Sequence, residues 1–327
     1  MNAYVSRAIY TMRLPLIIGP LLIHACMCQN FNLQYLLKVA GLCSVTVFYV
    51  ISGYLFWNGY NNTFESYSSK IRSRIKSLLV PYILWNIIAY IVFVCIGSLQ
   101  VTQWKEIFWV ISTDPGHGPA DYVLWFVRTL LMVIPFAPVY YIINKNKYLK
   151  WISVIALVLW FFEIPGIFSR GTIQGFVLFN FGSFLRLNNV FAKERFVPSR
   201  TAALFFSLLW IISVVCWWYV SLTDDSIVLY FGKSCILLSA FFYYSLPVIL
   251  PKRITDKLIE LSSSSFFFFC FFPVLLEPLK LILSQWLGEN DLTYLVIVVI
   301  VTIGSIYAYQ LLKKNIPTPT SILTGSR

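Results

Sequence analysis

Arg13 and His24 are the residues of the first hydrophobic segment whose side chains can do chemistry. They are three helical turns apart, so at about 100° per residue both side chains project from nearly the same stripe of a helix. An ionisable group at membrane depth is costly and normally faces a bundle interior or a wet cavity. The spacing therefore predicts an internal polar site, in which the neutral imidazole of His24 can take a proton from a hydroxyl group near neutral pH.

A second group of basic residues follows the second hydrophobic segment. Lys70, Arg72, Arg74 and Lys76 alternate along what we expect to be a loop on the inner side of the membrane. They are either stop-transfer charges that set topology or a docking site for an anionic cofactor, since guanidinium groups bind phosphates bidentately. The alternation by itself favours the first interpretation.

Four further residues are candidates for a supporting role. Ser52 precedes Gly53 at the end of the second segment, where the pair marks either close helix packing or a polar site. Arg128 lies within the fourth segment and needs a partner or a wet cavity. Glu163, at an outer helix end, is a catalytic base, a partner for a basic residue or simply a surface charge. His117 lies among turn formers in an outer loop, where it is either simply exposed or helps to bind an acceptor.

Composition places these residues in a membrane protein. The chain has 327 residues, of which 59% are hydrophobic and only 12% charged, whereas soluble domains carry roughly 25% charge. The first apolar stretch lacks a convincing cleavage site, so we expect it to be retained as a span. The seven cysteines fit neither a disulfide framework nor a metal site, and no metal is expected. The chain is predicted to form a single membrane-embedded domain over 1–327 without a separate soluble domain.

Hydropathy predicts an all-α, polytopic bundle of about ten transmembrane helices. The expected spans are 12–28, 36–57, 78–98, 121–142, 151–168, 171–188, 201–221, 228–249, 261–279 and 292–312. With the N-terminus inside, nineteen Lys and Arg fall in inner segments and three in outer ones, which is a positive-inside bias and predicts that both termini are cytoplasmic. Because the net charge of +12 is spread between the spans and forms no patch, the expected partner is the lipid bilayer and not nucleic acid.

The order of these motifs resembles the integral-membrane acyltransferase family 3, which includes bacterial O-antigen and other glycan O-acetyltransferases. The resemblance covers essentially the whole chain. It rests on Arg13 and His24 in the first span, on Phe48, Tyr49, Ser52 and Gly53 in the second, on Arg72, Arg74, Lys76, Pro81 and Tyr82 after it, and on Trp125, Phe126 and Gly182.

Two features of the chain depart from the family pattern. The basic segment has Arg72 and Arg74 with one intervening residue, where the family often has two, so which residue touches the cofactor is open. Late in the chain, Phe272 stands where the family commonly has a second histidine. Any role of that histidine is absent here or taken by another residue.

The resemblance implies transfer of an acetyl group, or less commonly a succinyl group, from cytoplasmic acetyl-CoA to a hydroxyl of a cell-surface or lipid-linked saccharide. O-antigen, capsule and exopolysaccharide units are the expected acceptors, and the bacterial cytoplasmic (inner) membrane is the expected location. Arg13, Arg72, Arg74 and Lys76 would hold the CoA phosphates. His24 would lie at the thioester and act as a general base or as a transient acyl carrier.

Two functions of other classes fit the same composition. A transporter or flippase for a glycan or lipid-linked precursor also has many spans and buried charges, but the internal repeats that such proteins tend to show are not evident here. A membrane sensor or structural protein without turnover is the other alternative, against which binding of acetyl-CoA would count.

Overall fold

The chain is helical throughout the part that the structure describes. The structure is a computed structural model, and it describes residues 2–27, 33–61, 63–99, 120–162, 171–192, 196–221 and 225–325. The α-helices are α1 (Ala3–Ala25), α2 (Leu33–Leu42), α3 (Ser44–Phe56), α4 (Phe64–Cys95), α6 (Trp125–Val133), α7 (Ala137–Lys145), α8 (Trp151–Phe162), α9 (Gly171–Leu187), α10 (Arg200–Val220), α11 (Asp225–Ile249), α12 (Lys252–Leu261), α13 (Ser265–Leu287), α14 (Asp291–Asn315) and α15 (Pro317–Leu323). Short 3-10 helices are η1 (Tyr122–Leu124), η2 (Ile134–Phe136), η3 (Val190–Ala192) and η5 (Ser262–Ser264).

The prediction of an all-α membrane bundle is confirmed. In the described residues, eight helical segments are long and apolar enough to cross a membrane, and two shorter apolar helices coincide with the fifth and sixth expected spans. The eight are Ala3–Ala25, Leu33–Phe56, Phe64–Cys95, Tyr122–Lys145, Arg200–Val220, Tyr230–Ile249, Lys252–Leu287 and Asp291–Asn315; the shorter two are Trp151–Phe162 and Ile173–Leu187. The total of ten spans and the cytoplasmic placement of both termini stay predictions.

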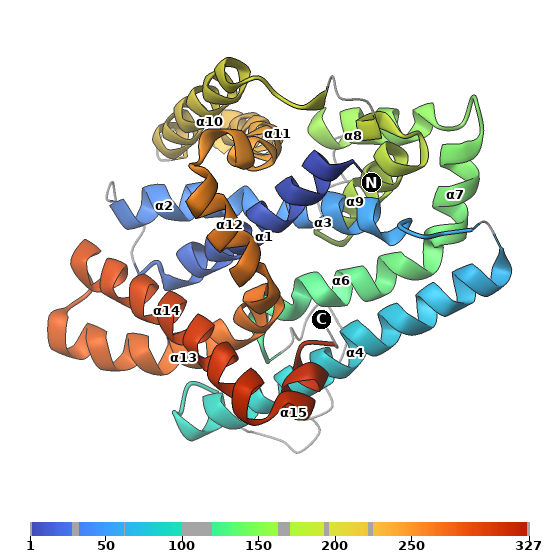
Figure 1. Ribbon diagram of the computed structural model, residues 1–327. Coiled ribbons are helices and arrows are strands. Elements are labelled where there is room, and N and C mark those ends of the chain that lie inside the picture. The colour runs from blue at the N-terminus through green and yellow to red at the C-terminus, as the bar shows by residue number, and fades with distance from the viewer. Residues whose placement is uncertain are drawn as a thin grey trace.

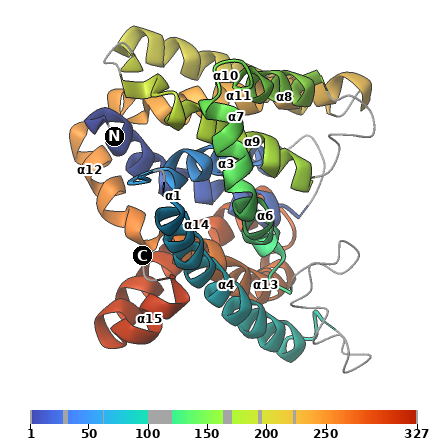
Figure 2. The same ribbon diagram turned by 90° about the vertical axis from the view of Figure 1, so that its right-hand side faces the viewer.

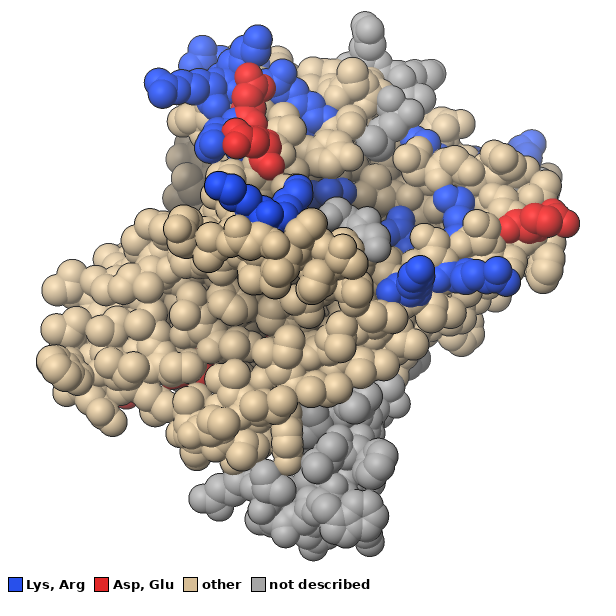
Figure 3. Space-filling model, turned by 60° about the horizontal axis from the view of Figure 1, so that its bottom comes forward, with Lys and Arg blue, Asp and Glu red and all other residues tan. Residues whose placement is uncertain are grey.

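The outer surface of the bundle carries the apolar side chains that lipid requires. On α14, Leu295, Val299, Ile303, Tyr307 and Leu311 are exposed, and their spacing of four residues places them along one stripe of the helix. In Figure 3, Lys and Arg gather over the upper and right-hand parts of the face shown, while a broad area at the lower left carries almost no charge. A large uncharged surface of this kind is typical of a lipid-facing wall.

Helices α1 and α3 form the middle of the bundle. In Figures 1 and 2, α8, α10 and α11 lie above them and α4, α13 and α15 lie below. Helix α1 contacts α2, α3, α11, α12 and α13, while α3 packs against α9. The first helix is therefore surrounded by protein, which is the environment that its charged residues need.

The basic segment 70–76 is helical, which differs from the loop expected there. Thr63 accepts a hydrogen bond from the backbone N–H of Ser66 (3.1 Å) and caps the start of α4 at Phe64. Helix α4 then continues through Pro81 to Cys95. The alternating basic residues therefore occupy fixed faces of a helix.

Candidate active site

Helix α1 carries Arg13 and His24 within one continuous segment. At 1.5 Å per residue, their Cα atoms are about 16 Å apart along the helix axis. Both side chains are half-buried. The prediction that the two residues share one helix is confirmed, and each of them marks one end of the candidate site.

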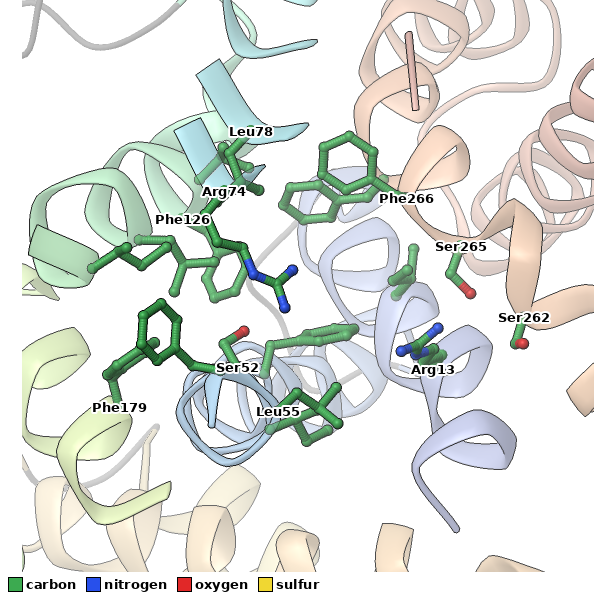
Figure 4. Close-up of a pocket in the computed structure, with 18 of the residues that line it drawn as sticks. Arg13, Ser52, Leu55, Arg74, Leu78, Phe126, Phe179, Ser262, Ser265 and Phe266 are labelled. Carbon is green, nitrogen blue, oxygen red and sulfur yellow. The ribbon is translucent and has the colours of Figure 1, made fainter. Parts of the chain in front are cut away.

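A cavity of about 510 Å³ lies at the Arg13 end and is called the basic cavity below. Its polar lining comes from Tyr10, Arg13, Ser52, Arg74, Ser262, Ser263 and Ser265. Its apolar wall combines aliphatic side chains with six phenylalanines, Phe48, Phe56, Phe126, Phe179, Phe266 and Phe269. Figure 4 shows the Arg74 guanidinium pointing into this space near Ser52, while Arg13 enters from α1.

The two arginines of the basic cavity have no carboxylate partner in the described residues. Arg13 lies over the ring of Tyr10, with its Cζ atom 4.6 Å from the ring centroid. Arg74 is close enough to Arg13 for the two positive charges to repel each other. The Ser265 hydroxyl is buried and lacks a hydrogen-bond partner among the described residues. A half-buried pair of like charges beside a free hydroxyl favours the binding of an anion.

Helical geometry separates the predicted cofactor-binding residues into two groups. Arg74 lines the basic cavity, whereas Arg72 and Lys76 are exposed and are not part of its lining. Each of these two residues is two positions from Arg74, and two positions turn a helix by about 200°. Of the four basic residues expected to hold the cofactor, the structure brings together Arg13 and Arg74.

His24 lies in the last turn of α1 and faces protein side chains. Its ring centroid is 4.5 Å from that of Tyr122 and 6.4 Å from that of Phe272. The backbone oxygen of His24 accepts a hydrogen bond from Lys280 Nζ (3.2 Å), and that of Leu22 accepts one from Tyr294 Oη (3.1 Å). These bonds occupy carbonyl groups that the end of a helix leaves unpaired.

A carboxylate holds the tyrosine that lies against the imidazole. Tyr122 Oη donates a hydrogen bond to Glu277 Oε1 at 2.9 Å, while the Tyr122 ring stacks on Phe93 with centroids 6.2 Å apart. Glu277 and Lys280 are both half-buried on α13. We call His24, Tyr122, Glu277 and Lys280 the histidine cluster.

Sequence reasoning missed three of the four members of the histidine cluster. Glu277 fell within the expected ninth span, 261–279, and an acidic residue at membrane depth is a functional candidate by default. That signal was present but was not used. Nothing in the sequence could indicate that Tyr122 meets Glu277, because the two residues are far apart along the chain.

Aromatic side chains separate the basic cavity from the histidine cluster. Phe126 and Phe269 line the cavity and contact each other, with ring centroids 6.0 Å apart. Phe269 in turn lies 6.5 Å from Phe272, the residue beside His24. His24 is not among the residues that line the cavity. We call Phe126, Phe269 and Phe272 the aromatic partition.

The remaining predicted residues have different positions. Ser52 lines the basic cavity, while its neighbour Gly53 packs tightly against α9. Arg128 Nη1 on α6 is buried without a hydrogen-bond partner among the described residues. The same is true of the Tyr82 hydroxyl on α4. His117 and Glu163 lie outside the described residues.

A comparison with known families identifies the chain. A family model described as an acyltransferase domain matches residues 11–310, a range that includes Arg13, His24, Arg74 and Glu277. No curated protein and no solved structure matches the chain.

Proposed function

The chain belongs to acyltransferase family 3, and from this membership we propose that it is an O-acetyltransferase that uses cytoplasmic acetyl-CoA. The proposed acceptor is a hydroxyl of a cell-surface or lipid-linked saccharide, and the proposed location is the bacterial inner membrane. The observation that carries the proposal is the arrangement on α1, where a cavity lined by two arginines and an imidazole in contact with aromatic side chains lie on one helix.

The donor would bind with its diphosphate in the basic cavity. Arg13 and Arg74 offer guanidinium donors that match phosphate oxygens, and no carboxylate competes for them in the described residues. The apolar wall suits the pantetheine arm, which carries few charges. An anionic donor would also relieve the repulsion between the two arginines.

The acetyl group would reach His24 by passing the aromatic partition. Phe126 and Phe269 line the cavity and contact each other, and Phe269 contacts Phe272, the residue beside the imidazole. Rotation of one of these rings, a motion ordinary for side chains, would admit the narrow thioester end of the arm. With the rings closed, the same side chains would keep water from the thioester.

The proposed reaction uses His24 as general base. The imidazole removes the proton of the acceptor hydroxyl while that oxygen attacks the carbonyl carbon of the thioester. A C–O bond forms, the C–S bond breaks, and the CoA thiolate leaves with the electron pair. The imidazole then gives its proton to the thiolate, which restores the neutral ring.

An alternative role of His24 stays open. As an acyl carrier, its ring nitrogen would take the acetyl group first and pass it to the hydroxyl in a second step. The carrier route predicts an acetyl-protein that can be trapped when donor is present and acceptor is absent. Mass spectrometry of the α1 peptide after such an incubation separates the two routes.

Glu277 and Tyr122 are proposed to position the imidazole. The tyrosine ring lies against His24, and its hydroxyl is fixed by the carboxylate. Phe272, which stands at the position of the second histidine in the family pattern, contacts His24 but has no group that transfers a proton. Glu277 is therefore the acidic group best placed to take over part of that role.

The function is tested by the chemistry of the cell surface. Mass spectrometry of surface and lipid-linked glycans from strains with and without the gene should show acetyl esters that depend on the gene, and it would identify the modified sugar. Glycans with the same ester content in both strains would contradict the proposal.

A further inference from the structure

A second cavity lies on the other side of the end of α3. It has a volume of about 470 Å³ and is called the α3 alcove. Its lining includes Tyr54 and Trp57, whereas Leu55 and Phe56, the residues between them, line the basic cavity. The last turn of α3 therefore separates the two cavities, and the rings of Phe56 and Trp57 are 5.0 Å apart across it.

The α3 alcove is positively charged. Lys145 and Arg186 contribute to its lining, and no acidic residue among those that the structure describes does. Lys145 Nζ donates to the backbone oxygen of Leu187 (3.3 Å), and Arg186 Nη2 donates to Asn58 Oδ1 (3.2 Å). An ammonium group has three N–H donors and a guanidinium five, so both side chains keep donors for an anion.

Three aromatic rings form one wall of the α3 alcove. Trp57 lies 5.0 Å from Tyr60 and 5.6 Å from Tyr141, and the two tyrosine rings are 5.4 Å apart. Trp57 is only 4% exposed, and its indole N–H has no hydrogen-bond partner among the described residues. A buried donor without an acceptor is costly and uncommon, so an acceptor brought to this wall would lower that cost.

The alternative explanations account for fewer of these features. Aromatic side chains at a membrane interface normally lie in contact with the headgroup region, but Trp57 is almost fully covered. A phospholipid would need an apolar groove for its chains, and among the described residues of this lining Leu187 is the one aliphatic side chain. Aromatic rings beside two cations instead match a planar base that carries phosphate, since a base stacks on the face of an aromatic side chain and phosphates pair with Lys and Arg.

We propose that the α3 alcove binds a phosphorylated purine nucleotide, with its base against Trp57, Tyr60 and Tyr141 and its phosphate on Lys145 and Arg186. A nucleotide of this chemistry can come from two sources. It is either the nucleotide end of acetyl-CoA, an assignment that rests on the function proposed above, or a free nucleotide that binds beside the active site. In the first case the donor wraps around the end of α3, with its arm in the basic cavity.

The test uses the full-length protein in detergent and adenosine 3′,5′-bisphosphate, which has the nucleotide end of CoA but neither the arm nor the thioester. Calorimetry should detect its binding to the wild type. The double variant Lys145→Gln/Arg186→Gln should bind it roughly tenfold or more weakly, because two charge-assisted contacts are lost. Tyr60→Leu should weaken the binding of both the bisphosphate and adenosine.

The matched control is Lys147→Gln, which removes the same charge two residues away from Lys145. Lys147 is exposed and is not part of the alcove lining, so its loss should leave binding unchanged. An unchanged melting temperature shows that a variant is folded. If the control and the double variant lost the same affinity for the bisphosphate, the loss would come from the lower net charge of the protein and not from the alcove. That result would overturn the proposal.

The source of the nucleotide follows from competition. If acetyl-CoA displaces the bisphosphate and the double variant weakens both ligands, the alcove holds the donor; if ATP competes and acetyl-CoA does not, it holds a free nucleotide. Absence of bisphosphate binding, or binding lost on Arg13→Gln/Arg74→Gln but kept in the double variant, would overturn the proposal. Neither result would contradict the proposed acetyl transfer, because that proposal is tested separately by measuring acetyl esters on glycans.

Discussion

The imidazole of His24 is held between side chains of two other elements, and the end of its helix is held as well. Tyr122 and Phe272 contact the ring, while Lys280 and Tyr294 bond to carbonyl groups in the last turn of α1. A general base must be aligned with the proton that it removes. These four contacts therefore bear directly on the rate of the proposed reaction.

Replacement of Glu277 should lower activity without lowering the amount of protein. Glu277→Ala removes the acceptor that fixes the Tyr122 hydroxyl, and we expect roughly tenfold less acetyl ester on glycans. Glu277→Gln keeps a carbonyl acceptor for Tyr122 and should retain more activity than the alanine variant. The measurement is the acetyl-ester content per amount of membrane-inserted protein.

The matched control for Glu277 is Glu289→Gln. Glu289 follows α13 and is exposed, so its replacement should leave the ester content unchanged. Wild-type ester content in Glu277→Ala would show that the carboxylate does not position His24. Equal losses of ester content in Glu277→Ala and Glu289→Gln would also show that the Glu277 carboxylate does not position His24.

Arg74 and Arg72 should differ in their effect on donor binding, although both were expected to hold the cofactor. Arg74→Gln removes a guanidinium that lines the basic cavity, and we expect the affinity for acetyl-CoA to fall roughly tenfold. Arg72→Gln removes the same charge from the exposed face of α4 and should change the affinity little. Titration calorimetry on the two purified variants makes the comparison, and equal losses would argue against the cavity as the phosphate site.

The distinction between the two arginines could not be predicted from the sequence. An alternating basic segment is ambiguous when it is taken as a loop, because a loop has no fixed faces. Once Thr63 caps α4 and the helix extends through the segment, the same alternation places Arg74 on one side and Arg72 on the other. The Arg13–His24 spacing was predictable because the helix around it was already implied by hydropathy.

Among the helices, α3 and α9 make the closest backbone approach at the site. A Cβ atom at Gly53 would overlap the backbone oxygen of Phe179, and one at Gly182 would overlap that of Val50. Glycines at such crossings let two helices pack without intervening side chains. This contact holds Ser52 and Trp57, on the two sides of α3, in their separate cavities.

Gly182→Ala should destabilise the protein in detergent. The added methyl group meets the backbone of α3, which cannot move aside as a side chain can, and overpacking of this kind costs about 1–3 kcal/mol. The control is Gly304→Ala, whose methyl group would meet only the Leu275 side chain at 3.1 Å. A lower melting temperature for Gly182→Ala alone is the expected result, and equal melting temperatures would contradict this packing argument.

The aromatic partition gives α6 and α13 a role in protecting the thioester. Phe126→Ala opens the space between the basic cavity and His24, so water should reach the donor more easily. Release of free CoA thiol from acetyl-CoA in the absence of acceptor should rise several-fold, as measured with a thiol reagent. Phe205→Ala, which removes a ring from the exposed face of α10, should leave the release unchanged. No rise in Phe126→Ala would contradict the role of the partition.

At the scale of the whole molecule, the fold follows from hydropathy more directly than the site does. Runs of apolar residues must be helical in lipid because every backbone group has to be paired within its own segment, so an expected span has one structure available to it. The histidine cluster depends instead on which helices are neighbours. Its members come from α1, η1 and α13. The periodicity of residues along one segment does not predict which other segments pack against it.

The central claim is that the imidazole of His24 catalyses the transfer of the acetyl group. The most direct measurement compares glycan acetyl esters in a gene-deletion strain that expresses either the wild type or His24→Ala at equal levels in the membrane. We predict that the esters fall by a factor of about 100 or more in the variant, while the purified variant still binds acetyl-CoA through the basic cavity. Wild-type ester levels in His24→Ala would contradict the account.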